Sequence, residues 1–288
     1  HRKRLAQRVI APNPMHGNIY PEARELLLGH LSAEEIQQWL VPLGIADWRK
    51  TYERLRRLAE VTGDPIEMAN LLPYLLVMLE DTPGPDRVLI SLERFFQGAQ
   101  APTALLHVLS DNLRGLEILI KLFAGSQYLT ETLLRNPDYL DLLIDPQSLA
   151  QSKTVAQLTA DLRAFAEADG HVLTLDQLRQ FQRRELLRIG VCDLLDLLDM
   201  LTVTIQLSNL ADCLIQACLA LAEARGQTST DGFVVLAMGK LGGRELNYSS
   251  DIDLLFLAED HAVRYQRLGE LLIEALNKVT GEGFLYRV

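Results

Sequence analysis

The sequence has little cysteine and histidine, and neither residue clusters. Cys192, Cys213 and Cys218 are the only cysteines and form no CxxC pair, and the six histidines show no HxxxH or HExxH pattern. An odd cysteine count without paired spacing is typical of a reducing compartment, so we expect a cytoplasmic protein with buried helical thiols. The histidine spacing argues against a zinc site.

An excess of positive charge and long hydrophobic runs are also absent. The formal net charge is −10, from 28 Lys and Arg against 38 Asp and Glu. Nucleic-acid binders normally present a basic stripe, so we expect no nucleic-acid partner. The uninterrupted apolar runs fall well short of the roughly 20 residues that span a membrane, and no signal peptide is visible. We therefore expect no membrane association.

An initiator methionine is missing as well, because the chain of 288 residues begins with His1. We expect the chain to be a piece of a longer protein. Its length allows one large domain or two ordinary ones, and an apolar fraction of 48% is enough for a sizeable core.

Helix-start signals recur along the first part of the chain. Ser32 and Glu35 have the spacing of a capping box, and Asp64 before Pro65 predicts an N-cap followed by a proline at the first helical position. Pro73 interrupts the apolar run that follows, which predicts a kink or a split. Capping residues and prolines at such short intervals favour a compact multi-helix domain.

Two long helices are predicted over residues 174–201 and 202–225, from apolar residues spaced three and four apart. Charged residues 183–185 and Arg188 mostly lie off this stripe. They are interpreted as a solvated face, or alternatively as arginines directed at phosphate. Gly226 and the polar residues after it end the helical part, so we place a domain boundary there and predict a helical domain over residues 1–226.

Residues 227–288 are predicted to form a partial α/β domain, truncated at its C-terminal end. Two short apolar runs, 233–238 and 252–257, are typical of buried strands. A helix is expected over residues 261–280, followed by a last strand over residues 284–288. The predicted fold class is thus mainly α, with a multi-helix domain followed by this α/β part.

Two carboxylates, Asp251 and Asp253, stand at the start of the second predicted strand. Side chains two residues apart on a strand share a face, about 7 Å apart along it. Carboxylates facing one way can hold hard divalent cations, and Mg²⁺ is commonly bound by one or two carboxylates plus substrate phosphates. The order of strand, glycine-rich loop (residues 239–250) and Asp-x-Asp indicates a metal-dependent nucleotidyl-transfer site, with these acids as catalytic metal ligands.

The phrase GKLGGRELNYSSDIDLLF, residues 239–256, closely resembles the signature of the glutamine synthetase adenylyltransferase family. That family carries two nucleotidyltransferase halves on one chain, and the wording ELN-x-SSDIDL is similar to its amino-terminal, adenylyl-removing half. The resemblance implies Mg²⁺-dependent phosphorolysis of AMP from a tyrosine of glutamine synthetase, giving ADP. It also implies that the full-length enzyme adds AMP from ATP, and that both reactions regulate nitrogen metabolism.

The resemblance further implies ATP, ADP and phosphate as substrates, with glutamine synthetase and a PII-type signalling protein as partners. It assigns nucleotide or phosphate binding to the glycine-rich loop, through Gly239, Lys240, Gly242, Gly243, Ser249 and Ser250. Glycines allow backbone N–H groups to approach phosphate oxygens, and Lys240 would neutralise phosphate charge. The serines either cap the loop or bind phosphate, and Arg244 with Glu245 is interpreted as a local ion pair.

Family members have a third carboxylate in a phrase like YRVD-x-RLRP. Tyr286, Arg287 and Val288 match its beginning, so the resemblance implies a third acid at the next position and a crippled site in this piece alone. Two rivals stay open. Another nucleotidyltransferase, such as a uridylyltransferase, would lack the KLGGRELN phrase, and a non-catalytic nucleotide-binding scaffold is disfavoured by the intact acids.

Overall fold

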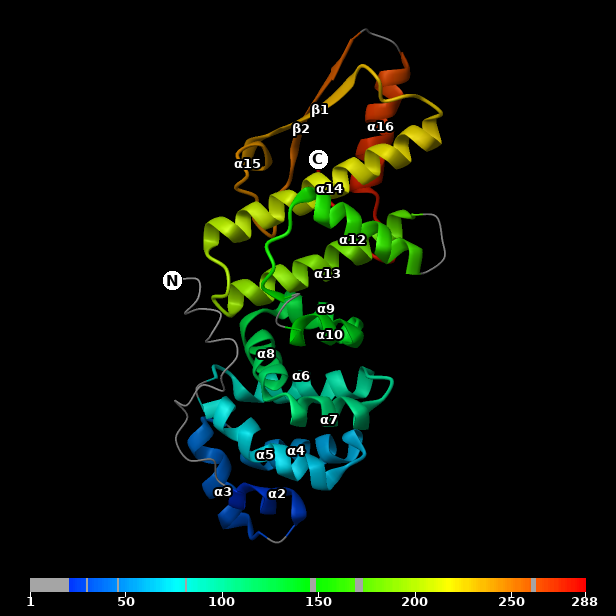
Figure 1. Cartoon of the computed structure of the whole chain (residues 1–288). Coiled ribbons are helices and arrows are strands. Elements are labelled where there is room, and N and C mark those ends of the chain that lie inside the picture. Colours follow the sequence, from blue (N-terminus) through cyan, green and yellow to red (C-terminus); the bar gives the residue numbers. More distant parts are fainter. Residues whose placement is uncertain are drawn as a thin grey trace. The chain divides into compact units, whose positions relative to one another are not determined.

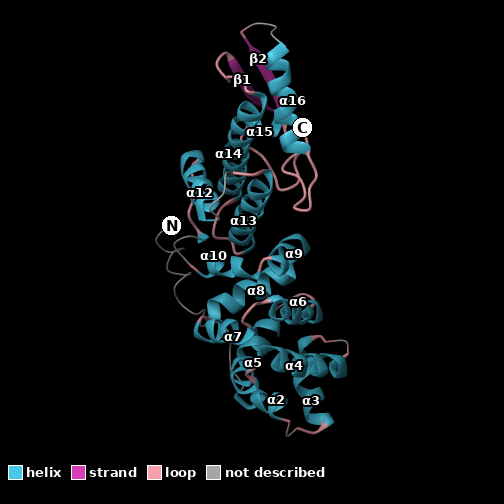
Figure 2. Ribbon diagram, turned by 90° about the vertical axis from the view of Figure 1, so that its right-hand side faces the viewer, coloured by secondary structure: helices cyan, strands magenta, loops and turns pink. Residues whose placement is uncertain are grey.

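A computed structural model describes residues 21–29, 31–45, 47–80, 82–145, 149–168, 173–259 and 263–288. The regular secondary structure of these residues is helical apart from one antiparallel hairpin (Figure 2). The predicted mainly α class with a small α/β part is therefore confirmed. Contacts divide the chain into two compact units, one up to Leu149 plus residues 190–197 and the other of residues 150–189 and 198–288.

The first unit is built of short helices, which Figure 1 shows in blue to green. They are η1 (Pro21–Arg24), α2 (Glu25–Leu28), α3 (Ala33–Leu40), η2 (Val41–Leu43), α4 (Trp48–Thr62), α5 (Pro65–Glu80), α6 (Pro85–Gly98), α7 (Pro102–Asp111), α8 (Leu113–Gly125), α9 (Gln127–Arg135), η3 (Pro137–Tyr139) and α10 (Leu140–Ile144).

The predicted helix starts form as capping chemistry requires. Ser32 N donates to Glu35 Oε2 at 2.8 Å and Glu35 N donates to Ser32 Oγ at 3.3 Å, which completes the capping box of α3. Asp64 Oδ1 accepts from Glu67 N at 3.0 Å at the start of α5. Of the kink or split expected at Pro73, the split is wrong, because α5 runs as one helix from Pro65 to Glu80, and the kink stays a prediction. Apolar side chains on both sides of the proline are buried, and such packing outweighs the lost hydrogen bond.

The second unit holds three longer helices, the hairpin and a final helix (Figure 1). Its elements are α12 (Val155–Ala168), α13 (Leu175–Leu194, shared with the first unit from residue 190), α14 (Met200–Gly226), β1 (Phe233–Met238), α15 (Gly239–Gly242), β2 (Asp253–Ala258) and α16 (Val263–Asn277). The predicted start of the last helix at His261 lies outside the described residues.

One hydrophobic core joins the helices of this unit to the segment that follows Gly226. Leu158 of α12, Phe181 of α13 and Leu214 of α14 belong to the same buried cluster as Leu241 and Ile252 of the hairpin region. The contacts therefore divide the chain differently from the boundary predicted at Gly226. A polar stretch after a helix indicates a turn, and here the turn lies inside a shared core.

The hairpin pairs β1 with β2 from Phe233↔Ala258 to Met238↔Asp253. The second strand is displaced by one residue from the predicted 252–257, because Ile252 N donates to Arg287 O at 2.9 Å outside the ladder. The strand expected over residues 284–288 does not form. This segment is instead held by single contacts, such as Leu285 N and Tyr286 N to Leu276 O at 3.1 and 3.2 Å.

Among the described helices, α14 is long and apolar enough to cross a membrane by length and composition, with a window of mean hydropathy 1.4. Within that window 61% is buried inside the structure, as in a core helix, so the signal is weak. Its side chains Leu207, Leu210 and Leu214 pack in the unit's own core.

Candidate functional site

Gly239 and Asp253 lie next to each other at the loop end of the hairpin. Asp253 pairs with Met238 in the last rung of the ladder, so Gly239 is the first residue beyond it. Gly239 has φ of 53°, and a Cβ atom there would collide with the Asp253 carboxylate. The positive φ favours glycine, since only glycine adopts it without steric cost, and a larger residue would also displace the Asp253 side chain. The first predicted loop residue and the second predicted acid thus lie in direct contact.

The glycine-rich loop begins as one helical turn, α15. Gly243 N donates to Gly239 O at 3.0 Å and Glu245 N donates to Lys240 O at 2.8 Å. A Cβ atom at Gly242 would lie 2.5 Å from Ala237 O, so this glycine lets the turn pack against β1. The side chain of Lys240 is exposed.

Apolar side chains anchor both ends of the loop. Leu241 is 3% exposed and Leu246 is 1% exposed, and both lie in the core cluster of the second unit. Leu246 N also donates to Ser208 Oγ of α14 at 3.4 Å. The loop is therefore held against α14, while its polar residues face outward.

Ser250 closes a turn with Asn247. Ser250 Oγ donates to Asn247 Oδ1 at 2.7 Å and accepts from Asn247 N at 3.3 Å, and Ser249 N donates to Asn247 Oδ1 at 3.3 Å. These contacts match the capping alternative for the serines. Phosphate binding by Ser249 or Ser250 stays a prediction.

Arg244 reaches α14 and not a neighbour in the loop, so the expected local pair with Glu245 is replaced by a longer-range contact. Its Nη1 lies 3.4 Å from Asp212 Oδ2, and its Nη2 donates to Asn209 Oδ1. Burial raises the pKa of Asp212, and the Arg244 guanidinium acts in the opposite direction. Sequence reasoning missed this partnership because the two segments are separated by more than thirty residues.

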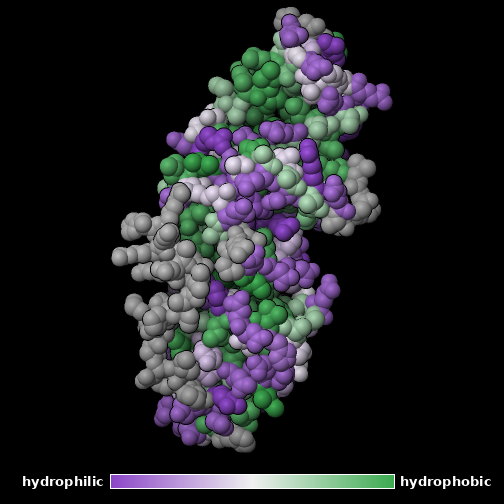
Figure 3. All heavy atoms as spheres, in the orientation of Figure 1, coloured by the Kyte–Doolittle hydropathy of each residue, from purple (hydrophilic) through white to green (hydrophobic). Residues whose placement is uncertain are grey.

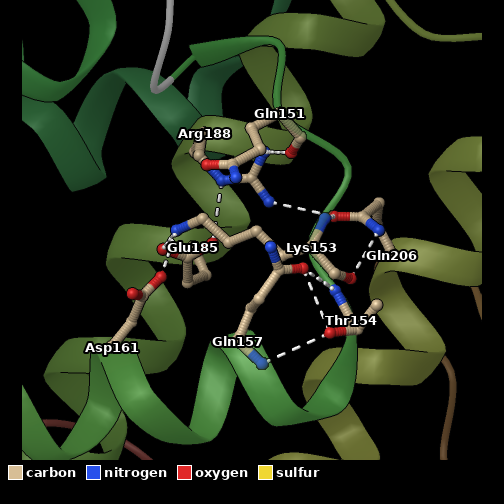
Figure 4. Close-up of polar contacts among 8 residues, drawn as sticks. All are labelled: Gln151, Lys153, Thr154, Gln157, Asp161, Glu185, Arg188 and Gln206. Carbon is tan, nitrogen blue, oxygen red and sulfur yellow. Dashed lines mark hydrogen bonds and ion pairs between the residues drawn. The ribbon is translucent and has the colours of Figure 1, made fainter.

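A buried polar network lies beneath this contact in the same unit (Figure 4). Glu185 is 1% exposed, and its carboxylate accepts from Lys153 Nζ and from Arg188 Nε, each at 2.8 Å. Arg188, which is fully buried, also donates to Gln206 Oε1 at 3.2 Å. Neither interpretation of these charges, a solvated face or arginines directed at phosphate, fits Glu185 and Arg188.

The predicted metal ligands have hard carboxylate oxygens and are both exposed. Asp251 precedes β2, and Asp253 is its first residue. Among the described residues no group of three or more His, Cys, Asp or Glu side chains forms a metal cage. Two open carboxylates next to a glycine turn fit the Mg²⁺ binding that relies on one or two acids and substrate phosphates.

The family model for glutamate-ammonia ligase adenylyltransferase matches residues 116–288, which is more than half of the chain. The chain belongs to this family. Glutamate-ammonia ligase is the systematic name of glutamine synthetase, so the family confirms the suspected resemblance. The matched span covers the hairpin, its loop and the buried network beneath it.

Two curated relatives carry the name bifunctional glutamine synthetase adenylyltransferase/adenylyl-removing enzyme. The one from Thioalkalivibrio sulfidiphilus is 29% identical over 90% of this chain, and the one from Nitrosococcus oceani is 34% identical over 93%. The chain spans 31% and 30% of their respective lengths. Nucleotidyl transfer is thus the chemistry of the family to which the chain belongs.

Proposed function

We propose that this chain carries the adenylyl-removing site of a bifunctional glutamine synthetase adenylyltransferase. The observation that carries the proposal is the contact between the Asp253 carboxylate and Gly239. This contact supports the proposal because it puts the predicted metal ligand beside the predicted phosphate-binding turn, and phosphoryl transfer needs both together. The ELN-x-SSDIDL wording at residues 245–254 supports the removing direction.

In the proposed reaction, a phosphate oxygen forms a bond to the phosphorus of the AMP group, and the bond from that phosphorus to the tyrosine oxygen breaks. The tyrosine oxygen takes up a proton and ADP is released. Asp251 and Asp253 would hold Mg²⁺, which supplies charge neutralisation at the phosphate oxygens when bound. Backbone N–H groups of the loop that begins at Gly239 would approach the phosphates, Gly242 lets that loop pack against β1, and exposed Lys240 adds positive charge.

The adenine ring has an apolar surface available beside the acids. Leu255 and Leu257 share the strand face of Asp253, and Leu236 of β1 lies opposite Leu255 on that face. These three side chains are 39–48% exposed, and Figure 3 shows hydrophobic surface over the hairpin. Burial of such side chains under a base contributes favourably to binding.

The partners of the proposed site are glutamine synthetase, which the names of the relatives mention, and a PII-type signalling protein. A reducing, cytoplasmic location suits three free, buried cysteines. The net charge of −10 supports a protein partner over nucleic acid.

The test is the Asp253→Asn variant of the full-length gene product, assayed for ADP release from AMP-modified glutamine synthetase with Mg²⁺ and phosphate. We expect a loss of about 100-fold or more, because one charged contact to a transferring phosphoryl group is typically of this size. The matched control is Asp231→Asn, the same change at an exposed position before β1, at the opposite end of the hairpin. It should retain the wild-type rate.

Phosphorolysis by Asp253→Asn near the wild-type rate would sink the assignment of this carboxylate. Incorporation of labelled AMP from ATP at the same site, without any release of ADP, would show that the direction is wrong.

A further inference from the structure

The backbone of Arg244 occupies a conformation that its side chain disfavours. Its φ of 58° lies in the left-handed region, where a residue with a Cβ atom is strained. The two residues before it in the loop are glycines, yet the strain falls on the arginine. Such a residue persists only where its surroundings over-determine it, so the reason should lie in what the side chain contacts.

The guanidinium of Arg244 binds two residues of α14 one turn apart. It lies 3.4 Å from the Asp212 carboxylate, and it donates to the amide oxygen of Asn209. Asn209 is 6% exposed, and its amide nitrogen donates to Lys153 O at 2.9 Å. The nitrogen and the oxygen of this amide each make a hydrogen bond, so a flip of the amide group would break both. Asn209 therefore presents its oxygen to Arg244 in one fixed direction.

The Lys153 backbone, on which Asn209 rests, is itself fixed. Lys153 N donates to Gln206 Oε1, and Gln206 Nε2 donates back to Lys153 O, each at 2.9 Å. Figure 4 shows this reciprocal pair beside Glu185 and Arg188, which hold the Lys153 side chain and Gln206 from the other side. Buried polar groups that are paired in this way specify one arrangement, because each alternative leaves a group unsatisfied.

We propose that Arg244 is a positioning residue, which fixes the glycine-rich loop on α14 through Asn209 and Asp212 and so presents the loop to the nucleotide. The effect on the nucleotide rests on the proposed function, whereas the effect on the loop stands without it. The buried side chains of Leu241 and Leu246 hold the loop against the core of the second unit, and the Arg244 contact fixes the orientation of the loop between them.

Three variants of the full-length gene product separate the side-chain contact from the backbone strain. Arg244→Ala removes the contact and keeps the strain. Arg244→Gly removes both, because glycine accepts positive φ freely. Arg267→Ala is the control, since it removes the same charge from an exposed pair with Glu270 on α16.

The readouts are hydrogen exchange at Gly243 and Leu246, whose amides are bonded in the loop and to α14, and the dissociation constant for Mg-ADP. Exchange should accelerate and Mg-ADP affinity should fall by about tenfold in both Arg244 variants, as expected from losing one charged hydrogen bond. The exchange of core amides in α14 should stay unchanged. Arg267→Ala should match the wild type.

Unchanged loop exchange in Arg244→Ala would overturn the inference. So would wild-type protection in Arg244→Gly, because the backbone and not the contact would then set the loop. If the wild-type full-length gene product does not bind Mg-ADP, the proposed function fails, and loop exchange alone decides the role of Arg244.

Discussion

Replacing Glu185 by glutamine should destabilise the second unit more than any surface change in it. The carboxylate is 1% exposed and lies between two cations, Lys153 Nζ and Arg188 Nε, each at 2.8 Å. Glutamine keeps the shape of the side chain and removes its charge. Arg188, which is fully buried, then loses its ion pair with Glu185.

The magnitude follows from which contacts survive. Breaking a buried pair by removing one partner typically costs about 3–5 kcal/mol. Lys153 keeps Asp161 at 2.8 Å, on the solvent side, and Arg188 keeps the neutral oxygen of Gln206 at 3.2 Å. These remaining contacts place the expected loss at the lower end, about 3 kcal/mol.

The assay is urea unfolding followed by two signals. Both tryptophans, Trp39 and Trp48, lie in the first unit, so tryptophan fluorescence reports that unit, whereas far-UV circular dichroism reports helices of both. Glu185→Gln should move the circular-dichroism transition of the second unit to lower urea. The control Glu270→Gln breaks an exposed pair with Arg267 and should stay within about 0.5 kcal/mol of wild type. A loss below about 1 kcal/mol for Glu185→Gln would refute the reasoning, because the substitution removes the charge from two buried ion pairs at once.

Three further predictions concern single groups. Gly239→Ala should lower phosphorolysis by about tenfold or more and stability by only about 1–2 kcal/mol, because it strains a positive φ and displaces the Asp253 carboxylate; equal activity would contradict it. Cys218, whose pKa burial raises to about 12, should not react with a thiol reagent at pH 8 until the chain is unfolded. The hydrogen bond from Arg94 lowers the pKa of Glu131 from 4.5, so its stabilisation is present above pH 4.5 and is lost as pH falls through the folded-state value. Glu131→Gln should flatten the acid limb of stability below pH 4.5, measured by unfolding at a series of pH values.

Local signals predicted the elements of the fold well. The capping box at Ser32 and the apolar run of β1 appear with the predicted bounds, because each depends on residues close in sequence. The division into units was less predictable. The turn after Gly226 resembles a linker in composition, yet residues on both sides of it share one core. The composition of this stretch indicates a turn, but it does not indicate which elements on either side of the turn pack together.

The site was predictable in its motif and not in its support. The glycine turn and the Asp-x-Asp phrase predict a site within residues 239–253, and this stays a prediction, although the structure brings Gly239 and Asp253 into contact. The partners of Arg244 were not predictable, because Asn209 and Asp212 lie on a helix whose pattern indicates only an apolar stripe. A polar residue inside such a stripe is the available signal, since an unpaired amide at a buried position is costly and implies a partner.

That reasoning extends to the charges of α13. Glu185 and Arg188 are three residues apart, which places them on the same helix face as each other, and periodicity alone assigns that face to solvent. They can be buried because Lys153 and Gln206 supply complementary groups, so that each of the two charges has a hydrogen-bonding partner in the core. The same unit then uses the paired network to hold the Lys153 backbone, against which Asn209 directs Arg244. Glu185 and Arg188, which the sequence pattern assigns to the surface, thus help to orient the candidate nucleotide-binding loop through Lys153, Asn209 and Arg244.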